Sequence, residues 1–250
     1  MRTIRALTVG AAAIFGLSLA TAASASAAAP EFGICNRVQK GTGSYANAGC
    51  TTPAAGKDYE WFSEAVRKPK LEIESTSPVK LETVTGFKVS CTRAIEGGYI
   101  FGDEEVNETG LAFTGCSNAG VKCGSFGAAE GEFFLAASDG ELGVISRGAT
   151  AAEDKVGLEL DGLSATFHCG SSEEVEIHGS LIVPLKANKM LTTEKLKYSA
   201  KRGKQDPERF EGGTKAVLEV SVNREEFLPA GLSANMTLLF EQPVEVNSVV

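Results

Sequence analysis

Apolar and polar residues alternate along most of the chain after residue 70. Successive side chains of a β-strand point to opposite faces, so a period of two residues predicts strands. The alternation predicts strands over 79–83, 156–161, 175–183, 216–223 and 232–240. No stretch has the 3.6-residue period of a long amphipathic helix.

Turn-forming residues separate these strands. Asp139-Gly140, Asp161-Gly162 and 229–231 are typical turn sequences. Many short strands joined by Gly-rich turns favour an all-β fold, an antiparallel β-sandwich or barrel-like structure. We expect one antiparallel β domain over 28–250, with two β-subdomains and a seam near 147–154 as the alternative.

The N-terminus has the order of a secretory signal peptide. Arg2 and Arg5 precede an apolar stretch over 7–22, and an Ala/Ser run over 23–29 follows. The apolar stretch is shorter than the roughly 20 residues needed to span a bilayer. We expect cleavage after Ala27, a signal peptide over 1–27, and a secreted, extracellular product with no membrane span.

The charge of the chain argues against some partners. The formal net charge is −8, and loss of Arg2 and Arg5 with the signal peptide takes the exported chain to −10. Nucleic acids and anionic lipids repel such a chain, so neither is expected as a partner. Solubility is the simplest role for this charge.

All six cysteines follow the predicted signal peptide. An even number of cysteines in an oxidising compartment predicts three disulfides, for which several connectivities are possible. The cysteines are Cys35, Cys50, Cys91, Cys116, Cys123 and Cys169. Because no pair has the C-x-x-C spacing, redox and zinc sites are not favoured.

Local sequence suggests a pairing of these cysteines. Cys116 and Cys123 flank a turn-rich loop, and Cys35 and Cys50 bracket a Gly-rich segment, which favours two local bridges. Cys91 and Cys169 then remain. Alternation also predicts strands over 87–91 and 165–169, and each cysteine lies on the apolar face of its strand, which favours a buried bridge between them.

No convergent catalytic set is evident. His168 and His178 lie on the polar faces of predicted strands, and no G-x-S-x-G motif is present. The acidic segments 103–108 and 173–174 favour solvated loops. Calcium binding at 103–108 and a glycosidase-like carboxylate pair are the alternatives. We predict no catalytic residue, no metal site and no cofactor.

Two segments are candidates for ligand contact. Tyr59 and Trp61 share one side of a predicted strand, where they either plug the core or form an aromatic platform for a sugar ring. The lysine-rich segment 195–204 is either a solvated hairpin tip or a contact for anionic wall polymers. Cell-wall or extracellular glycan is therefore the expected class of partner.

Gly- and Cys-containing segments carry a family resemblance. They lie at 31–35, 43–50, 59–61, 113–116, 127–131 and 209–213. They resemble an uncharacterised family of secreted, cysteine-containing all-β proteins of soil actinobacteria. The resemblance implies bacterial export and a cysteine framework, and it transfers no catalytic or binding residue.

These observations favour a non-enzymatic exported β-protein of the cell envelope or extracellular space, and a binding module is the role it suggests. Two alternatives stay open. One is a secreted carboxylate-dependent glycan hydrolase. The other is a protease-inhibitor-like protein that presents the loop between Cys116 and Cys123.

Overall fold

The computed structural model describes residues 29–63, 68–137 and 139–248. This part of the chain forms nineteen β-strands, one 3₁₀ turn, η1 (Ala151–Glu153), and no α-helix. The predicted all-β antiparallel class is therefore confirmed. The expected signal peptide, 1–27, lies outside the described residues.

The strands differ widely in length, from two residues in β10 to twenty in β19. They are β1 (Glu31–Arg37), β2 (Gly43–Tyr45), β3 (Pro53–Lys57), β4 (Tyr59–Ser63), β5 (Lys70–Ser75), β6 (Val79–Thr83), β7 (Lys88–Cys91), β8 (Arg93–Ile100), β9 (Glu105–Thr114), β10 (Ser117–Asn118), β11 (Val121–Gly124), β12 (Phe133–Leu135), β13 (Asp139–Ser146), β14 (Lys155–Cys169), β15 (Glu173–Leu185), β16 (Leu191–Lys201), β17 (Lys204–Asp206), β18 (Leu218–Val222) and β19 (Leu228–Asn247).

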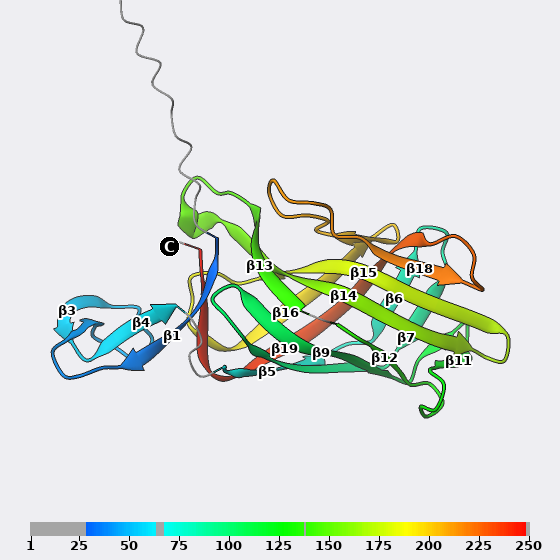
Figure 1. Ribbon diagram of the computed structural model, residues 1–250, viewed down its shortest axis with the longest axis horizontal. Coiled ribbons are helices and arrows are strands. Elements are labelled where there is room, and N and C mark those ends of the chain that lie inside the picture. The colour runs from blue at the N-terminus through cyan, green and yellow to red at the C-terminus, as the bar shows by residue number, and fades with distance from the viewer. Residues whose placement is uncertain (1–28, 64–67, 138, 249–250) are drawn as a thin grey trace, which may run out of the picture.

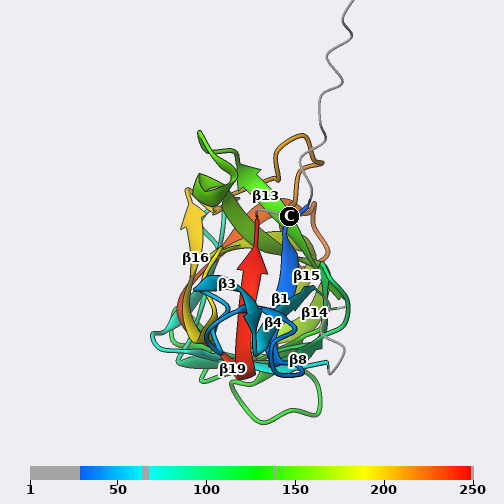
Figure 2. The same cartoon turned by 90° about the vertical axis from the view of Figure 1, so that its left-hand side faces the viewer.

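Hydrogen bonding between strands forms a closed circuit. It runs β5–β8–β9–β13–β14–β15–β18–β19 and returns to β5. A shorter row, β6–β7–β10–β11, links β19 to β14 near one end. Figure 1 shows the long strands lying side by side, and Figure 2 shows them arranged around a common interior.

The interior is filled by the apolar faces of these strands. Three phenylalanine rings stack at its centre: Phe133 lies 4.8 Å from Phe113 and 4.2 Å from Phe167, measured between ring centroids. Inward-facing residues of the predicted alternation, such as Val175 and Ile177 of β15, are buried against them. Burial of apolar area supplies most of the stabilisation of such a core.

Three expected turn sequences lie inside strands: Asp139-Gly140 in β13, 229–231 in β19 and Asp161-Gly162 in β14. Asp161-Gly162 was expected to form a turn, but it lies inside a continuous strand of fifteen residues. The ladder with β15 pairs Leu160 with Leu181 and then Leu163 with Gly179, so two residues of β14 oppose one residue of β15. This is a β-bulge, which bends the strand without ending it.

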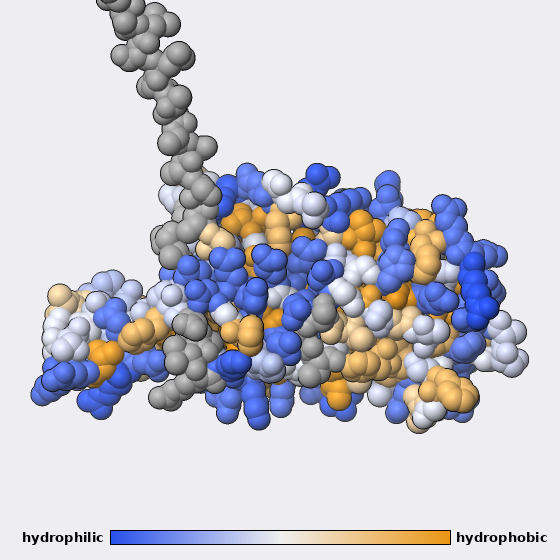
Figure 3. Space-filling model, viewed as in Figure 1, coloured by the Kyte–Doolittle hydropathy of each residue, from blue (hydrophilic) through white to orange (hydrophobic). Residues whose placement is uncertain are grey.

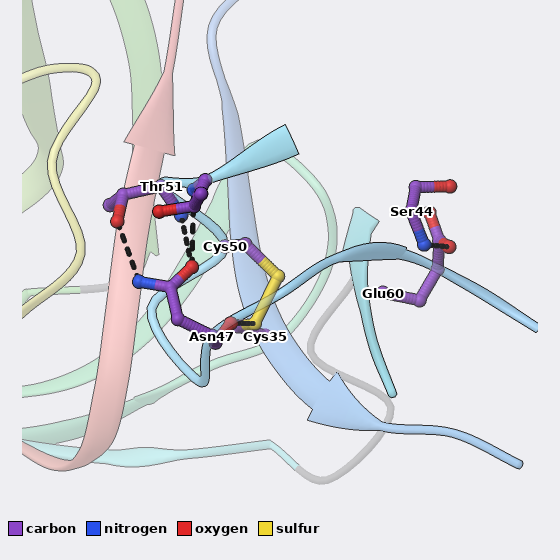
Figure 4. The surroundings of a disulfide bond; sticks show 7 residues. Cys35, Ser44, Asn47, Cys50, Thr51 and Glu60 are labelled. Atoms are coloured by element: carbon purple, nitrogen blue, oxygen red, sulfur yellow. Dashed lines mark hydrogen bonds between the residues drawn. A yellow bond between two sulfur atoms is a disulfide. The ribbon is translucent and has the colours of Figure 1, made fainter. Parts of the chain in front are cut away.

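The first four strands form a small sheet at one end of the molecule (Figure 1). Strand β1 joins it to the main body, because Glu31–Gly33 pair with Glu245–Asn247 of β19. The predicted bridge between Cys35 and Cys50 is present (Figure 4). Next to it, the Asn47 side-chain oxygen accepts hydrogen bonds from the backbone N–H groups of Thr51 and Thr52.

The other two predicted bridges are wrong. Cys91 bonds to Cys116, and Cys123 bonds to Cys169. Cys116 and Cys123 are neighbours across the β10–β11 hairpin, where the Cys123 N–H donates to the Cys116 carbonyl. Each sulfur instead reaches the strand on its other side, β7 or β14. No disulfide joins Cys116 to Cys123, although each is bonded to another strand, and the protease-inhibitor alternative stays a prediction.

The proposed seam near 147–154 is the connection between β13 and β14, two strands of one ladder. Arg147 bonds to Asp154 at 2.8 Å, and the Gly148 N–H donates to the same carboxylate. The Gly148 N–H contributes most to lowering the pKa of Asp154, burial opposes it, and Arg147 lowers it further. The single-domain organisation stays a prediction. In the described residues, no helix is long and apolar enough to cross a membrane.

Candidate functional site

An acidic cleft of about 610 Å³ lies on the outer face of β9, β13, β14 and β15. Figure 3 shows hydrophilic side chains gathered over this part of the molecule, around β13. The residues that line the cleft are Phe101, Glu105, Asn107, Asp139, Gly140, Glu141, Glu159, Asp161, Ser180, Thr214 and Lys215. Five of them carry carboxylates, and one carries an ammonium group.

Strand alternation explains why the carboxylates face outward. The residues next to them along each strand, such as Leu142 and Leu160, are buried in the core. The register pairs Glu141 with Glu105 on one side and with Glu159 on the other. Three carboxylates therefore lie directly across neighbouring strands. Like charges in this arrangement destabilise a sheet, so stability does not account for this row.

The bulge in β14 shapes one wall of the cleft. It leaves Ser180 opposite Asp161 and Gly162, and the Ser180 hydroxyl donates to Glu159 Oε1 at 2.8 Å. Gly179 has a φ of 118°, and a Cβ at this position would lie 1.9 Å from the Val217 carbonyl oxygen. Only glycine fits there, because the positive φ and the close Val217 carbonyl exclude a Cβ.

Glu159 differs electrostatically from an ordinary surface acid. Burial raises its pKa most, and the charges of Asp161 and Glu141 raise it further. The hydrogen bond from Ser180 lowers the pKa but does not reverse the shift. A carboxyl with a raised pKa can be protonated, and can donate a hydrogen bond, at a higher pH than a free glutamate.

The rim of the cleft adds other chemistry. Phe101 is 49% exposed and lies edge-on to Tyr99, with 6.4 Å between the ring centroids. The Lys68 ammonium lies 4.3 Å from the centre of the Phe101 ring. Asn107 donates to Asp139 at 3.4 Å, and Lys215 pairs with Glu208 at the opposite side. The cleft therefore combines hydrogen-bond acceptors, donors and an exposed aromatic ring.

The acidic segment 103–108, for which calcium was an alternative, divides between a turn and β9. Glu105 and Asn107 reach the cleft, whereas the Asp103 carbonyl accepts the Phe32 N–H. Among the described residues, no three Asp, Glu, His or Cys side chains converge as metal ligands.

Tyr59 and Trp61, the predicted ligand platform, lie in β4 of the small N-terminal sheet and do not line the cleft. The indole ring of Trp61 covers Gly33 of β1, where a Cβ would lie 2.0 Å from Trp61 Cζ2. The buried indole N–H lies near Glu245 without reaching good hydrogen-bond geometry. Burial raises the pKa of Glu245, and Trp61 opposes that shift. These contacts give Trp61 a packing role.

The two histidines lie apart from the cleft. His168 pairs with Glu174 across β14 and β15. The His178 ring lies 4.0 Å from the Phe227 ring, and its Nε2 is 3.8 Å from Glu219. Sequence reasoning had found only Glu105 and Asn107 of the cleft residues. The signal that could have located the cleft is an acid on the polar face of each of three neighbouring strands.

Comparisons of this chain with protein families, with curated proteins and with solved structures give no match. The resemblance to secreted proteins of soil actinobacteria stays a prediction. The geometry of the acidic cleft is accordingly the main guide to function.

Proposed function

We propose that the chain is a secreted, non-enzymatic binding module and that the acidic cleft binds an extracellular glycan. The observation that carries this proposal is the combination of a carboxylate row with an exposed Phe101 at the rim. Sugar hydroxyls donate to carboxylates, and the apolar face of a sugar ring packs on an aromatic side chain. The carboxylates of the row lie on paired strands, and Phe101 directly follows the end of β8.

The energetic cost of the site supports this interpretation. Glu105, Glu141 and Glu159 repel one another across the sheet, and a ligand that donates hydrogen bonds to them would offset that repulsion. The Ser180 hydroxyl holds Glu159 in position before any ligand arrives. A preorganised site loses less entropy on binding.

Binding to soluble oligosaccharides and to insoluble cell-wall polysaccharide tests the proposal. We expect Phe101→Ala and Glu141→Gln each to weaken binding by about tenfold, the loss of one well-made contact. Phe126→Ala is the matched control, because Phe126 is also exposed and lies outside the cleft. Absence of binding to every glycan, or equal binding by the cleft variants and the control, would overturn the proposal.

One observation favours a second candidate, a carboxylate-dependent glycan hydrolase. Glu159, which has a raised pKa, lies on β14 directly opposite Glu141 of the neighbouring strand β13. Glycosidases use one protonated and one ionised carboxyl group. Release of reducing ends from the same glycans, abolished by Glu159→Gln, would identify this activity. Binding without release of reducing ends would support the binding module.

A further inference from the structure

The closed circuit of strands has an open seam between β15 and β16. Among the described strands, β18 pairs with β15 over Val175–Gly179, and only β14 pairs with Leu181–Leu185. Over Leu191–Lys197, β16 pairs with β19 along one edge, and no other described strand pairs with its second edge. Figure 2 shows β16 at the side of the molecule, with β19 next to it.

A pocket of about 550 Å³ lies at the open seam, and its charge is the opposite of the chain's. Four of its nine lining residues are lysines: Lys186, Lys189, Lys195 and Lys197. All four are exposed. The one acid, Glu194, is only 7% exposed, and its Oε1 accepts the Lys186 N–H at 2.5 Å. The lysine ammonium groups therefore remain available to a partner.

We propose that the open seam binds an extended acidic peptide segment, which adds to β16 as a further strand. An unpaired strand edge offers backbone N–H and C=O groups in the spacing that another strand requires. The alternate side chains of an added strand would then lie beside Lys195 and Lys197, which share one face of β16.

The lysines also decide which strand can add. Charged residues on an edge strand prevent pairing with a second copy of the same edge, because like charges would meet. In such a pair, Lys195 and Lys197 of one copy would repel the same lysines of the other copy. Acidic side chains of a peptide would instead be attracted to them. Charge complementarity therefore selects an acidic peptide over another copy of this chain.

The first experiment uses the wild-type chain and a short synthetic peptide in which Glu and Val alternate. We expect the peptide to bind, and its affinity to fall as the salt concentration rises. A matched peptide, N-methylated at every backbone amide, keeps its charge and loses the hydrogen-bond donors of both strand edges. We expect it to bind at least about tenfold more weakly, because strand addition depends on backbone hydrogen bonds.

The second experiment places the peptide on β16. We expect Lys195→Glu/Lys197→Glu to weaken binding of the parent peptide by at least about tenfold. Lys40→Glu/Lys57→Glu is the control with the same charge change, in exposed lysines of the N-terminal segment. Loss of binding in the first variant only, with the N-methylated peptide weak, supports the proposal.

Three outcomes would overturn it. The parent peptide fails to bind the wild-type chain, or both lysine double variants bind it alike. In the third, the N-methylated peptide and dextran sulfate bind as tightly as the parent peptide. That result would identify a surface for anionic polymers in place of an edge for strand addition. Glycan binding at the acidic cleft is measured separately and does not depend on any of these results.

Discussion

Strand β14 connects two regions that differ in how they are held together. At one end, Cys169 bonds to Cys123 and Phe167 is fully buried in the aromatic stack. At the other end, Glu159 and Asp161 face the acidic cleft, and no disulfide joins the strands there. The apolar core is continuous through both regions. The comparison suggests that cross-links and aromatic packing at one end allow the other to carry unfavourable charges.

The largest expected change in stability concerns the aromatic stack. We expect Phe167→Ala to lower the free energy of unfolding by about 3–5 kcal/mol, because it leaves a cavity between packed rings. Urea unfolding measures this change. Phe126→Ala is the control: this side chain is 102% exposed, and its loss should change stability by less than about 0.5 kcal/mol. Equal effects of the two substitutions would break the comparison.

Removal of disulfides tests the cross-links. Cys123→Ala/Cys169→Ala opens a bridge with a sequence separation of 46, and Cys35→Ala/Cys50→Ala opens one with a separation of 15. Chain entropy predicts losses of about 4 and about 3 kcal/mol respectively. Thermal and urea unfolding of both variants show which loss of stability is larger. A larger loss from the Cys35–Cys50 variant would contradict the assignment of the main stabilising role to the β14 end.

The third prediction concerns Glu194, a buried acid of β16. Burial raises its pKa to about 7, against 4.5 for the free group, and the Lys186 N–H only partly offsets this. The folded state therefore binds this proton more tightly than the unfolded chain, and ionisation costs stability. The cost is absent below pH 4.5, grows as the pH rises to 7, and is complete above it.

We expect Glu194→Gln to remove that cost. The variant should be more stable than wild type at pH 8, by on the order of 1–3 kcal/mol, and equally stable at low pH. The glutamine oxygen can still accept the Lys186 N–H, so this contact is retained. Urea unfolding at several pH values measures the difference. A difference that does not depend on pH would show that the charge of Glu194 is not its cause.

The smallest expected effect lies in the acidic cleft. Glu159→Gln removes one like charge from the row and keeps an acceptor for Ser180, so we expect a gain of about 0.5 kcal/mol at pH 7. The same variant should bind glycan more weakly. Stability and binding would then change in opposite directions, as expected where ligand chemistry costs stability. A loss of stability would contradict this account.

The sequence predicted the positions of the strands better than it predicted which strands pair with each other. Alternation located β6 and most of β15 and β19, because it depends only on which side chains face the core. The predicted bridge between Cys91 and Cys169 was wrong, because the order of strands in the sheet depends on contacts between distant segments. The cleft carboxylates come from three strands, so no short motif contains them. Asp161-Gly162 lies in a bulge because β14 continues to pair with β15 on both sides of it.

The β10–β11 hairpin affects the order in which the chain acquires its disulfides. Hairpins form within about 1–10 μs, whereas disulfides form in seconds or longer. Cys116 and Cys123 flank this hairpin, and their native partners arrive only with β7 and β14. We therefore expect oxidation of the incompletely folded chain to join Cys116 to Cys123 first. Thiol–disulfide exchange must then replace that bridge, so the yield of native protein would depend on disulfide isomerisation.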